Sequence, residues 1–430
     1  MSAPVMRRAS LLAFAALAAC QRAPEPAPPV PAVTGPPLKV SRDVAAFYAA
    51  RANRPLWVTP AGPKPEAYAA AARLAGAAAD GLDPARYGAA DVQAALDAAR
   101  GGEAKAVARA ELLLSAAYAD YARDLRKPAG DRTIYAEPDL APRPLAAGEA
   151  LVAPLAVNPL YEALREGHAR WRRGAHAPAQ EALVRLNLDR ARAIQPRERR
   201  YIIVDAASAR LWRVDGKRVE GPMKVIVGKP AMATPMLASR IRYVVLNPWW
   251  NVPPDLARER AKRVLGEGPG LIRRQRLQIL SDWSDAARPI PASAVDWRGV
   301  AAGRKTLRLR QLPGGDNVMG AVKFMMPNRL GIYLHDFPDK SLFARADRRL
   351  SSGCVRLSDA PGLLAWAFRG RPPAPSGHSA EQPVDLPEPV PVYVTYLTVL
   401  PGGPDGLTFQ PDPYGRDSGR EAPVRRAAED

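Results

Sequence analysis

The spacing of apolar residues changes at about Arg199, and this change restricts the fold more than any other feature of the chain. Before it, apolar residues recur every three or four positions, most clearly over residues 103–127, as on the buried face of a helix. After it, short runs such as residues 201–204 and 241–246 have the β-branched and alternating character of strands. We therefore predict an α+β chain in which a helical domain precedes a mainly β domain.

Composition divides the chain further. The 430 residues are enough for two or three domains with a sizeable core. The expected parts are a signal segment (1–20), a Pro/Ala-rich tether (21–40), a helical domain (41–195), a β domain (196–400) interrupted by a charged insert (254–304), and a disordered tail (401–430).

The N-terminus resembles a bacterial lipoprotein signal. Arg7 and Arg8 precede an apolar run that is too short to span a bilayer, and the run ends at Cys20 after small residues. In such a lipobox Cys20 becomes the lipidated first residue. Because Gln21 and not Asp follows, lipoprotein sorting implies the periplasmic face of the outer membrane. An ordinary secretory signal is the alternative. With Cys20 acylated no disulfide forms, and Cys354 stays a free thiol.

The chain is strongly basic, with a formal charge of +19. Such a charge suits an anionic partner, such as a carboxylate-rich polymer or a membrane surface, although general solubility is an equally good explanation. No zinc-finger spacing, RNA-binding aromatic motif or dense Lys/Arg run is present, so nucleic acid is not an expected partner. Zinc needs three or four ligands, and the few His and Cys residues do not supply them. We expect no metal and no cofactor.

Cys354 and His335 are the candidate catalytic pair. A thiol becomes a strong nucleophile as thiolate, and a nearby imidazole promotes that ionisation. His335 ends an apolar, strand-like run, and the small residues before Cys354 predict a tight turn whose amides, around Gly353 and Cys354, would form an oxyanion hole. The alternative is a buried structural cysteine with a core histidine. His168, on a helix face, is expected to be a packing residue.

The pattern around the pair resembles a known family. His335 followed by Ser351-Ser352-Gly353-Cys354-Val355-Arg356 is similar to the signature of the L,D-transpeptidase (YkuD-type) catalytic domain. Further blocks resemble the larger Gram-negative, YcbB-like group, at residues 186–190, 225–229, 247–253, 311–314 and 322–328. The resemblance implies that the helical domain is a scaffold and the insert a lid. It also implies that the group's small peptidoglycan-binding domain is missing, since only about thirty residues (160–186) bridge the two parts.

The resemblance implies a reaction on peptidoglycan stem tetrapeptides. Cys354 would attack the carbonyl of the L-centre of the third residue, release D-Ala and form a thioester. An amine of a neighbouring stem would then resolve the thioester as a 3→3 cross-link. Water as acceptor would make the protein an L,D-carboxypeptidase, and a lipoprotein amine would attach protein to the wall. A non-catalytic peptidoglycan tether is the alternative from another class. A papain-like protease or amidase would have Cys before His, the reverse of the order here.

The same resemblance implies the residue roles. His335 would be the general base and acid, oriented by the backbone carbonyl of Asp336. Arg356 lies two residues after Cys354 and so on the same face of an extended segment, which suits carboxylate binding, with a structural salt bridge as the alternative. Tyr333 would line the pocket. Ser352 belongs to the expected substrate-binding set, with a structural role also open. Carbapenem-type β-lactams would acylate Cys354.

Overall fold

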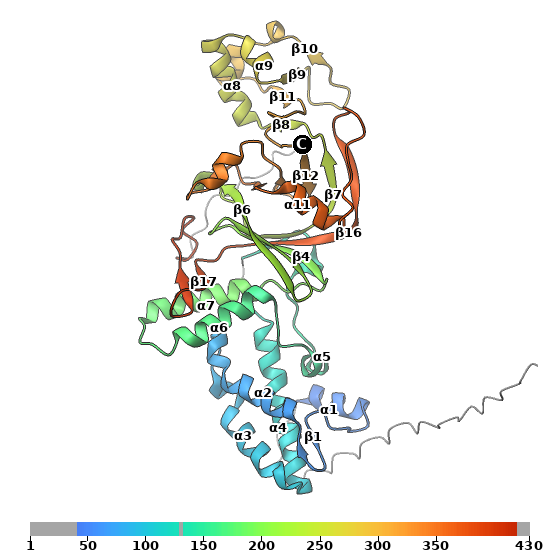
Figure 1. The fold of residues 1–430 in the computed structure, drawn as a ribbon, viewed down its shortest axis with the longest axis vertical. Helices are drawn as coiled ribbons and strands as arrows, with labels where there is room; N and C mark the ends of the chain where they lie inside the picture. The colour runs from blue at the N-terminus through green and yellow to red at the C-terminus, as the bar shows by residue number, and fades with distance from the viewer. Residues whose placement is uncertain (1–40, 129–131, 419–430) are drawn as a thin grey trace, which may run out of the picture.

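The computed structural model describes residues 41–128 and 132–418. Three parts follow one another along its long axis, with the helical domain at one end, the β domain in the middle and the insert at the other end (Figure 1). The proposed signal segment and tether, including Cys20, lie outside the described residues, as does the end of the predicted tail. No helix within the described ranges is both long and apolar enough to cross a membrane.

The helical domain packs around one long helix, α4 (Ala104–Leu125), where the periodicity predicted a helix over residues 103–127. Glu111 on this helix is fully buried, and its carboxylate accepts the backbone N–H groups of Trp57 at 2.9 Å and Val58 at 3.0 Å. These charge-assisted hydrogen bonds fasten the N-terminal segment to the domain's core. The other helices of this part are α1 (Arg42–Ala50), α2 (Pro65–Ala75), α3 (Ala89–Ala98), α5 (Ala147–Val152), α6 (Pro159–Trp171) and α7 (Pro178–Arg192).

The β domain is a sheet that closes on itself. Its strands follow the order β12-β13-β15-β6-β5-β4-β16-β7-β3, and β7 also pairs with β12, which completes a ring. Their bounds are β3 (Ile134–Tyr135), β4 (Arg200–Asp205), β5 (Arg210–Asp215), β6 (Arg218–Gly228), β7 (Leu237–Leu246), β12 (Val322–Met325), β13 (Leu334–His335), β15 (Val355–Leu357) and β16 (Gln382–Thr395); β14 (Arg349–Ser351) pairs with β6. Apolar side chains such as Val244, Phe324 and Leu334 fill the interior.

The insert is larger than the predicted residues 254–304. It has a sheet of its own in the order β10-β9-β11-β8 and a separate apolar core. Its elements are β8 (Trp250–Val252), α8 (Pro254–Glu267), α9 (Gly270–Arg274), β9 (Leu277–Leu280), β10 (Pro289–Ile290), α10 (Trp297–Ala301) and β11 (Arg308–Gln311). The prediction that residues 305–311 return to the catalytic sheet was wrong, because Leu309 packs into the insert core and β11 pairs with β8 and β9.

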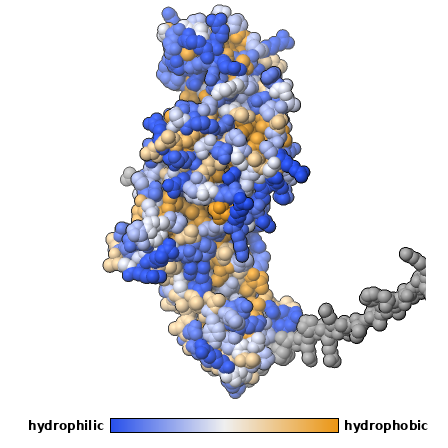
Figure 2. Space-filling view, in the orientation of Figure 1, coloured by the Kyte–Doolittle hydropathy of each residue, from blue (hydrophilic) through white to orange (hydrophobic). Residues whose placement is uncertain are grey.

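One buried side chain holds the two connections between the insert and the β domain, which we call the neck of the insert. Asn317 is fully buried, and its Nδ2 donates to the carbonyl oxygens of Pro248 and Leu312, each at 3.0 Å. These two residues lie where the chain enters and leaves the insert. The Asn317 amide therefore ties the two crossings together. Figure 2 shows that the insert, at the upper end of the view, presents a mainly hydrophilic surface on this side.

Two further predictions need correction. The tail was expected to be disordered from residue 401, but β17 (Val399–Pro401) pairs with β18 (Leu407–Phe409), and Asp417 forms an ion pair of 2.6 Å with Arg190 of α7. The Gly and Pro residues of this segment allow tight turns that let it dock on the helical domain. Residues 41–195 were expected to be a helical domain, but within this range β3 pairs with β7 of the β domain.

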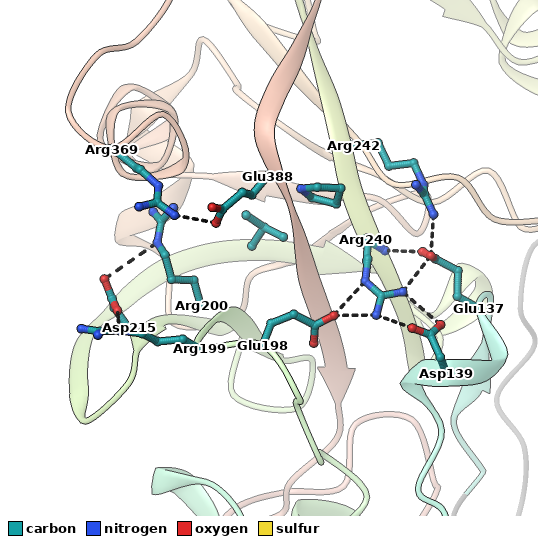
Figure 3. A pocket seen from close by; sticks show the side chains of 12 residues that line it. Glu137, Asp139, Glu198, Arg199, Arg200, Asp215, Arg240, Arg242, Arg369 and Glu388 are labelled. Atoms are coloured by element: carbon teal, nitrogen blue, oxygen red, sulfur yellow. Dashed lines mark hydrogen bonds and ion pairs between the residues drawn. The ribbon is translucent and has the colours of Figure 1, made fainter.

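A charged cavity of about 850 Å³ lies beside β7 and β16 (Figure 3). At its centre Arg240 of β7 binds three carboxylates, with contacts of 2.8 Å to Glu137, 2.7 Å to Asp139 and 2.6 Å to Glu198. Glu137 and Asp139 belong to the crossover from the helical domain, and Glu198 to the linker before β4. The network thus clamps both connections to the β domain. Cys354, His335 and Arg356 do not line this cavity.

Replacing Arg240 with Met should lower the free energy of unfolding by about 1–3 kcal/mol, because three carboxylates would lose their shared partner. Urea unfolding measures this change. Arg242→Met is the matched control, since Arg242 is half exposed and pairs with Glu137 alone. Equal losses in the two variants would mean that Arg240 is not the centre of the clamp.

Candidate active site

Strand pairing brings the two candidate catalytic residues together. His335 ends β13, which lies between β12 and β15. The pairing with β15 is parallel and aligns Leu334 with Val355 and His335 with Arg356. Cys354 directly precedes β15, so that it lies beside Tyr333, whose carbonyl accepts the Val355 N–H at 3.1 Å. The His and Cys of the motif are therefore neighbours across two adjacent strands.

The alternation of side chains places the site on the outer face of the closed sheet. Leu334, Val355 and Leu357 belong to the interior core. Because side chains alternate between the faces of a strand, His335, Cys354 and Arg356 point the other way. This outer face is itself covered: Ile226 of the adjacent strand packs with Phe337 and Phe343 in a small separate apolar cluster. The site is thus an outward-facing surface that neighbouring segments bury.

The imidazole of His335 is oriented by the backbone. Its Nδ1 lies 2.5 Å from the backbone oxygen of Asp336, so Nδ1 carries the hydrogen and Nε2 is left as the acceptor. The carboxylate of Asp336 is engaged elsewhere, where it accepts the Ala321 N–H at 3.0 Å and Lys340 Nζ at 2.7 Å. The backbone carbonyl, and not the side chain of Asp336, therefore sets the tautomer.

His335 is an uncharged base at neutral pH. Its side chain is 2 % exposed, and this burial, together with the Arg356 cation, lowers its pKa from 6.5 to about 3. The resting protein therefore does not hold an imidazolium beside the thiol. His335 would become protonated only during a reaction, when it accepts the proton of Cys354.

The turn before Cys354 depends on a glycine. Gly353 has φ 117°, a conformation that disfavours other residues, and a Cβ there would lie 3.1 Å from Ile332 Cδ1. The Gly353 carbonyl accepts the Thr234 hydroxyl at 2.8 Å. Ser352 is half-buried in the same turn.

One expectation for this turn needs correction. The Gly353 N–H donates to Ser351 Oγ at 3.1 Å, and that hydroxyl donates to the Cys354 carbonyl at 2.6 Å. The Gly353 amide is thus engaged within the turn and is not free to stabilise an oxyanion while this hydrogen bond persists. Cys354 Sγ lies 3.6 Å from the Gly331 carbonyl oxygen.

Arg356 is a half-buried cation without an acidic partner among residues 41–128 and 132–418. Its guanidinium lies over the Phe337 ring at 4.2 Å, and its Nε is buried with no hydrogen-bond partner there. Burial lowers its pKa, whereas Cys354 and Tyr333 favour the charged form. The structure contains no salt bridge of Arg356 to a described carboxylate, the alternative that the sequence left open. An unpaired cation is costly to bury, so it suits an anionic ligand.

Tyr333 joins the site to the insert. Its ring centroid lies 5.8 Å from that of His335, and its hydroxyl donates to Met319 Sδ at 3.5 Å. The side chain packs against both the interior core of the β domain and the core of the insert. The predicted pocket-lining residue therefore lies at the boundary between the two parts.

The remaining histidines do not approach this site as ligands. His168 is fully buried in the helical domain, with Nδ1 2.8 Å from the Ala79 carbonyl, which agrees with a packing role. His176 stacks on Trp171 at a centroid distance of 3.5 Å. Within the described part of the chain, no three His, Cys, Asp or Glu side chains converge as a metal site would require.

Sequence reasoning missed one residue of the site. Lys323 pairs with His335 across β12 and β13 and is 8 % exposed. Its signal was present: a lysine lies between Val322 and Phe324 in a strand that is otherwise apolar.

His335 should make the stability of the protein fall as the pH drops from about 6.5 toward 3. The unfolded chain binds a proton at His335 near pH 6.5, whereas the folded chain does so only near pH 3. Urea unfolding of the wild type and of His335→Gln between pH 7 and pH 4.5 measures the effect. The free energy of unfolding should fall more steeply with decreasing pH in the wild type than in His335→Gln, by the slope that corresponds to about one extra proton bound on unfolding. Identical slopes in the two proteins would contradict a buried, neutral imidazole.

Comparison with known proteins identifies both parts of the chain. Residues 199–375 match the family profile of the L,D-transpeptidase catalytic domain, YkuD, and residues 42–169 match that of a scaffold domain. A Haemophilus influenzae protein named "Putative L,D-transpeptidase" is 32% identical over 202 residues, which are 45% of this chain and 40% of that protein. The match thus spans less than half the length of this curated relative. The predicted L,D-transpeptidase catalytic domain, and the predicted order of a helical scaffold before a mainly β catalytic domain, are confirmed.

Three solved structures are similar at low identity. The carbamoyl enzyme of Ldtfm with avibactam is 13% identical, with TM-score 0.21 over 46% of this chain and 49% of that one. An L,D-transpeptidase from Mycobacterium smegmatis is 14% identical, with TM-score 0.22 over 46% and 58%. L,D-transpeptidase 1 of Mycobacterium tuberculosis is 14% identical, with TM-score 0.19 over 46% and 60%.

Proposed function

We propose, for a chain whose residues 199–375 match the L,D-transpeptidase catalytic domain, that Cys354 takes the acyl group of a peptidoglycan stem tetrapeptide, releases D-Ala and passes the acyl group to an amine of a neighbouring stem. The product is a 3→3 cross-link. The observation that carries this proposal is the outer face shared by Cys354, His335 and Arg356, which gathers a thiol, an uncharged base and an unpaired cation.

The first half of the reaction forms a thioester. His335 Nε2 takes the Cys354 proton while the sulfur attacks the carbonyl carbon of the third stem residue. The bond from that carbon to the D-Ala nitrogen then breaks, and the imidazolium returns the proton to the leaving amine. Since the environment of His335 disfavours the imidazolium, this cation is a strong acid and returns the proton readily.

The second half reverses the roles. The acceptor amine attacks the thioester carbonyl, His335 takes a proton from it, and the carbon–sulfur bond breaks to regenerate the Cys354 thiol. Arg356 would bind a carboxylate of the stem, because its charge has no acidic partner in the described chain. The insert, which packs on Tyr333, would act as a lid that excludes water and so favours an amine acceptor.

Other outcomes use the same site. Water as acceptor would give an L,D-carboxypeptidase, and an amine on a lipoprotein would attach that protein to the wall. A non-catalytic tether would bind stems without turnover. For location we propose the periplasm, with a lipid on Cys20 holding the protein at the outer membrane and next to its polymer. The membership of the YcbB-like group is likewise a proposal, based on the motif blocks.

The enzyme should convert disaccharide-tetrapeptide muropeptides into cross-linked dimers with loss of D-Ala. A soluble form that begins at residue 21 and mass spectrometry of the products test this, and Cys354→Ala should lower turnover by at least about 10³-fold while the protein stays folded. Tripeptide alone would indicate a carboxypeptidase, and bound but unchanged muropeptide would indicate a tether. Turnover that persists in Cys354→Ala would contradict the nucleophile.

A carbapenem should acylate the protein once, at Cys354. Its strained amide presents a carbonyl to the thiol in the way the stem does, and the resulting thioester stays bound. Intact mass followed by peptide mapping measures the adduct. Cys354→Ala should give none, and Lys217→Met, which alters an exposed residue in the hairpin between β5 and β6, should still be acylated. An adduct on any other residue would contradict the assignment.

A further inference from the structure

One row of side chains crosses the active-site strands. Lys323 of β12 pairs with His335 of β13 in antiparallel register, and His335 pairs with Arg356 of β15 in parallel register. Directly paired residues lie on the same face, with their Cβ atoms about 5 Å apart. The imidazole is therefore flanked on both sides by a cation, one from each adjacent strand.

Lys323 is held in this row by a carboxylate. Its side chain is largely buried, and Nζ lies 3.3 Å from Glu381 Oε1. The same oxygen accepts the Trp249 N–H at 2.6 Å, at the neck of the insert. Its neighbours Val322 and Phe324 fill the interior core, whereas Lys323 points to the opposite face. A lysine at this position adds little to packing and costs desolvation, which indicates that its charge is used.

We propose that Lys323 is a positioning residue of the active site: together with Arg356 on the opposite side, its ammonium group keeps the imidazole of His335 uncharged, and Glu381 fixes the ammonium in place. This inference rests on the proposed function for the role of His335 as base. It extends that function by assigning to β12 a residue that touches neither the substrate nor the sulfur.

The charged and titratable groups described around His335 come from β13 and from the segments on either side of it. Arg356 and the Cys354 thiol face it from β15 and the turn before it, and Lys323 faces it from β12. On its own strand Tyr333 is uncharged, and the Asp336 carboxylate is paired with Lys340. Burial is the main cause of the low pKa of His335, and the Arg356 cation comes next; Asp336 raises the pKa through its backbone carbonyl and its carboxylate, and Lys323 lowers it by a smaller amount. An isolated unit charge at about 6 Å would be worth about one to two pH units in a partly buried site, and the paired Glu381 carboxylate reduces the effect of Lys323 toward the lower end.

The titration of His335 tests the proposal without any substrate. The soluble protein with isotope-labelled histidine is followed by NMR, and His335→Gln assigns the resonance. In Lys323→Met the midpoint should rise by about one pH unit relative to the wild type. Lys323→Arg, which keeps the charge, should restore the low midpoint, and Lys217→Met, which removes an exposed charge in the hairpin between β5 and β6, should not change it.

Two results would overturn the proposal. An unchanged midpoint in Lys323→Met would show that the ammonium does not act on the imidazole. A rise in Lys323→Arg as large as in Lys323→Met would show a packing role. Should Lys323→Met fail to fold, Lys323→Gln replaces it. Its midpoint should rise in the same way, and an unchanged midpoint would overturn the proposal.

The rate of carbapenem acylation against pH separates this proposal from the proposed function. At low pH the acylation rate falls as His335 becomes protonated. In Lys323→Met this fall should occur at a higher pH, shifted by the same amount as the NMR midpoint. A purely structural defect would instead lower the rate equally at all pH values. If the wild type is not acylated but the NMR shift occurs, the proposed function fails and the electrostatic role of Lys323 stands. If acylation proceeds and its rate falls at the same pH in both proteins, the role of Lys323 fails and the function stands.

Discussion

The whole active site depends on β13 lying between β12 and β15. This two-residue strand is antiparallel to one neighbour and parallel to the other, and the register of both pairings sets which side chains share a face. A slip of one residue on either side would send Cys354 or His335 toward the interior core. The closed ring of strands makes such a slip costly, because each strand has Val, Leu or Phe side chains committed to the interior.

The site combines burial with positive charge. His335 is almost inaccessible, and Arg356 lacks a carboxylate partner among the described residues, while Lys323 has one in Glu381. Proteins rarely bury a cation without compensation, since the desolvation cost is large. The closed sheet and the Arg240 clamp supply the stability that offsets this cost. The positive φ of Gly353 and the buried, unpartnered Nε of Arg356 both lie at the site.

The insert is tied to the site at its neck. Asn317 bonds both crossings of the chain, Tyr333 packs on both cores, and Glu381 bonds Trp249 as well as Lys323. A movement of the insert relative to the sheet would therefore be transmitted to Tyr333 and Lys323, which flank His335. In the proposed reaction this connection would allow the occupancy of the site and the position of the insert to influence each other.

Local patterns in the sequence determined the order of domains, the helices and strands, and the identity of the Cys, His and Arg of the motif. These patterns are periodicities and short motifs, which need no knowledge of distant contacts. Only the tertiary structure decided where the insert ends, because the alternation of apolar residues in β11 is the same whichever sheet the strand joins. Only the tertiary structure decided that residues 401–418 are ordered, because this segment is held by docking on α6 and α7. It also decided that the Gly353 amide closes its own turn and that Lys323 stands beside His335, since strand register, a long-range property, places both.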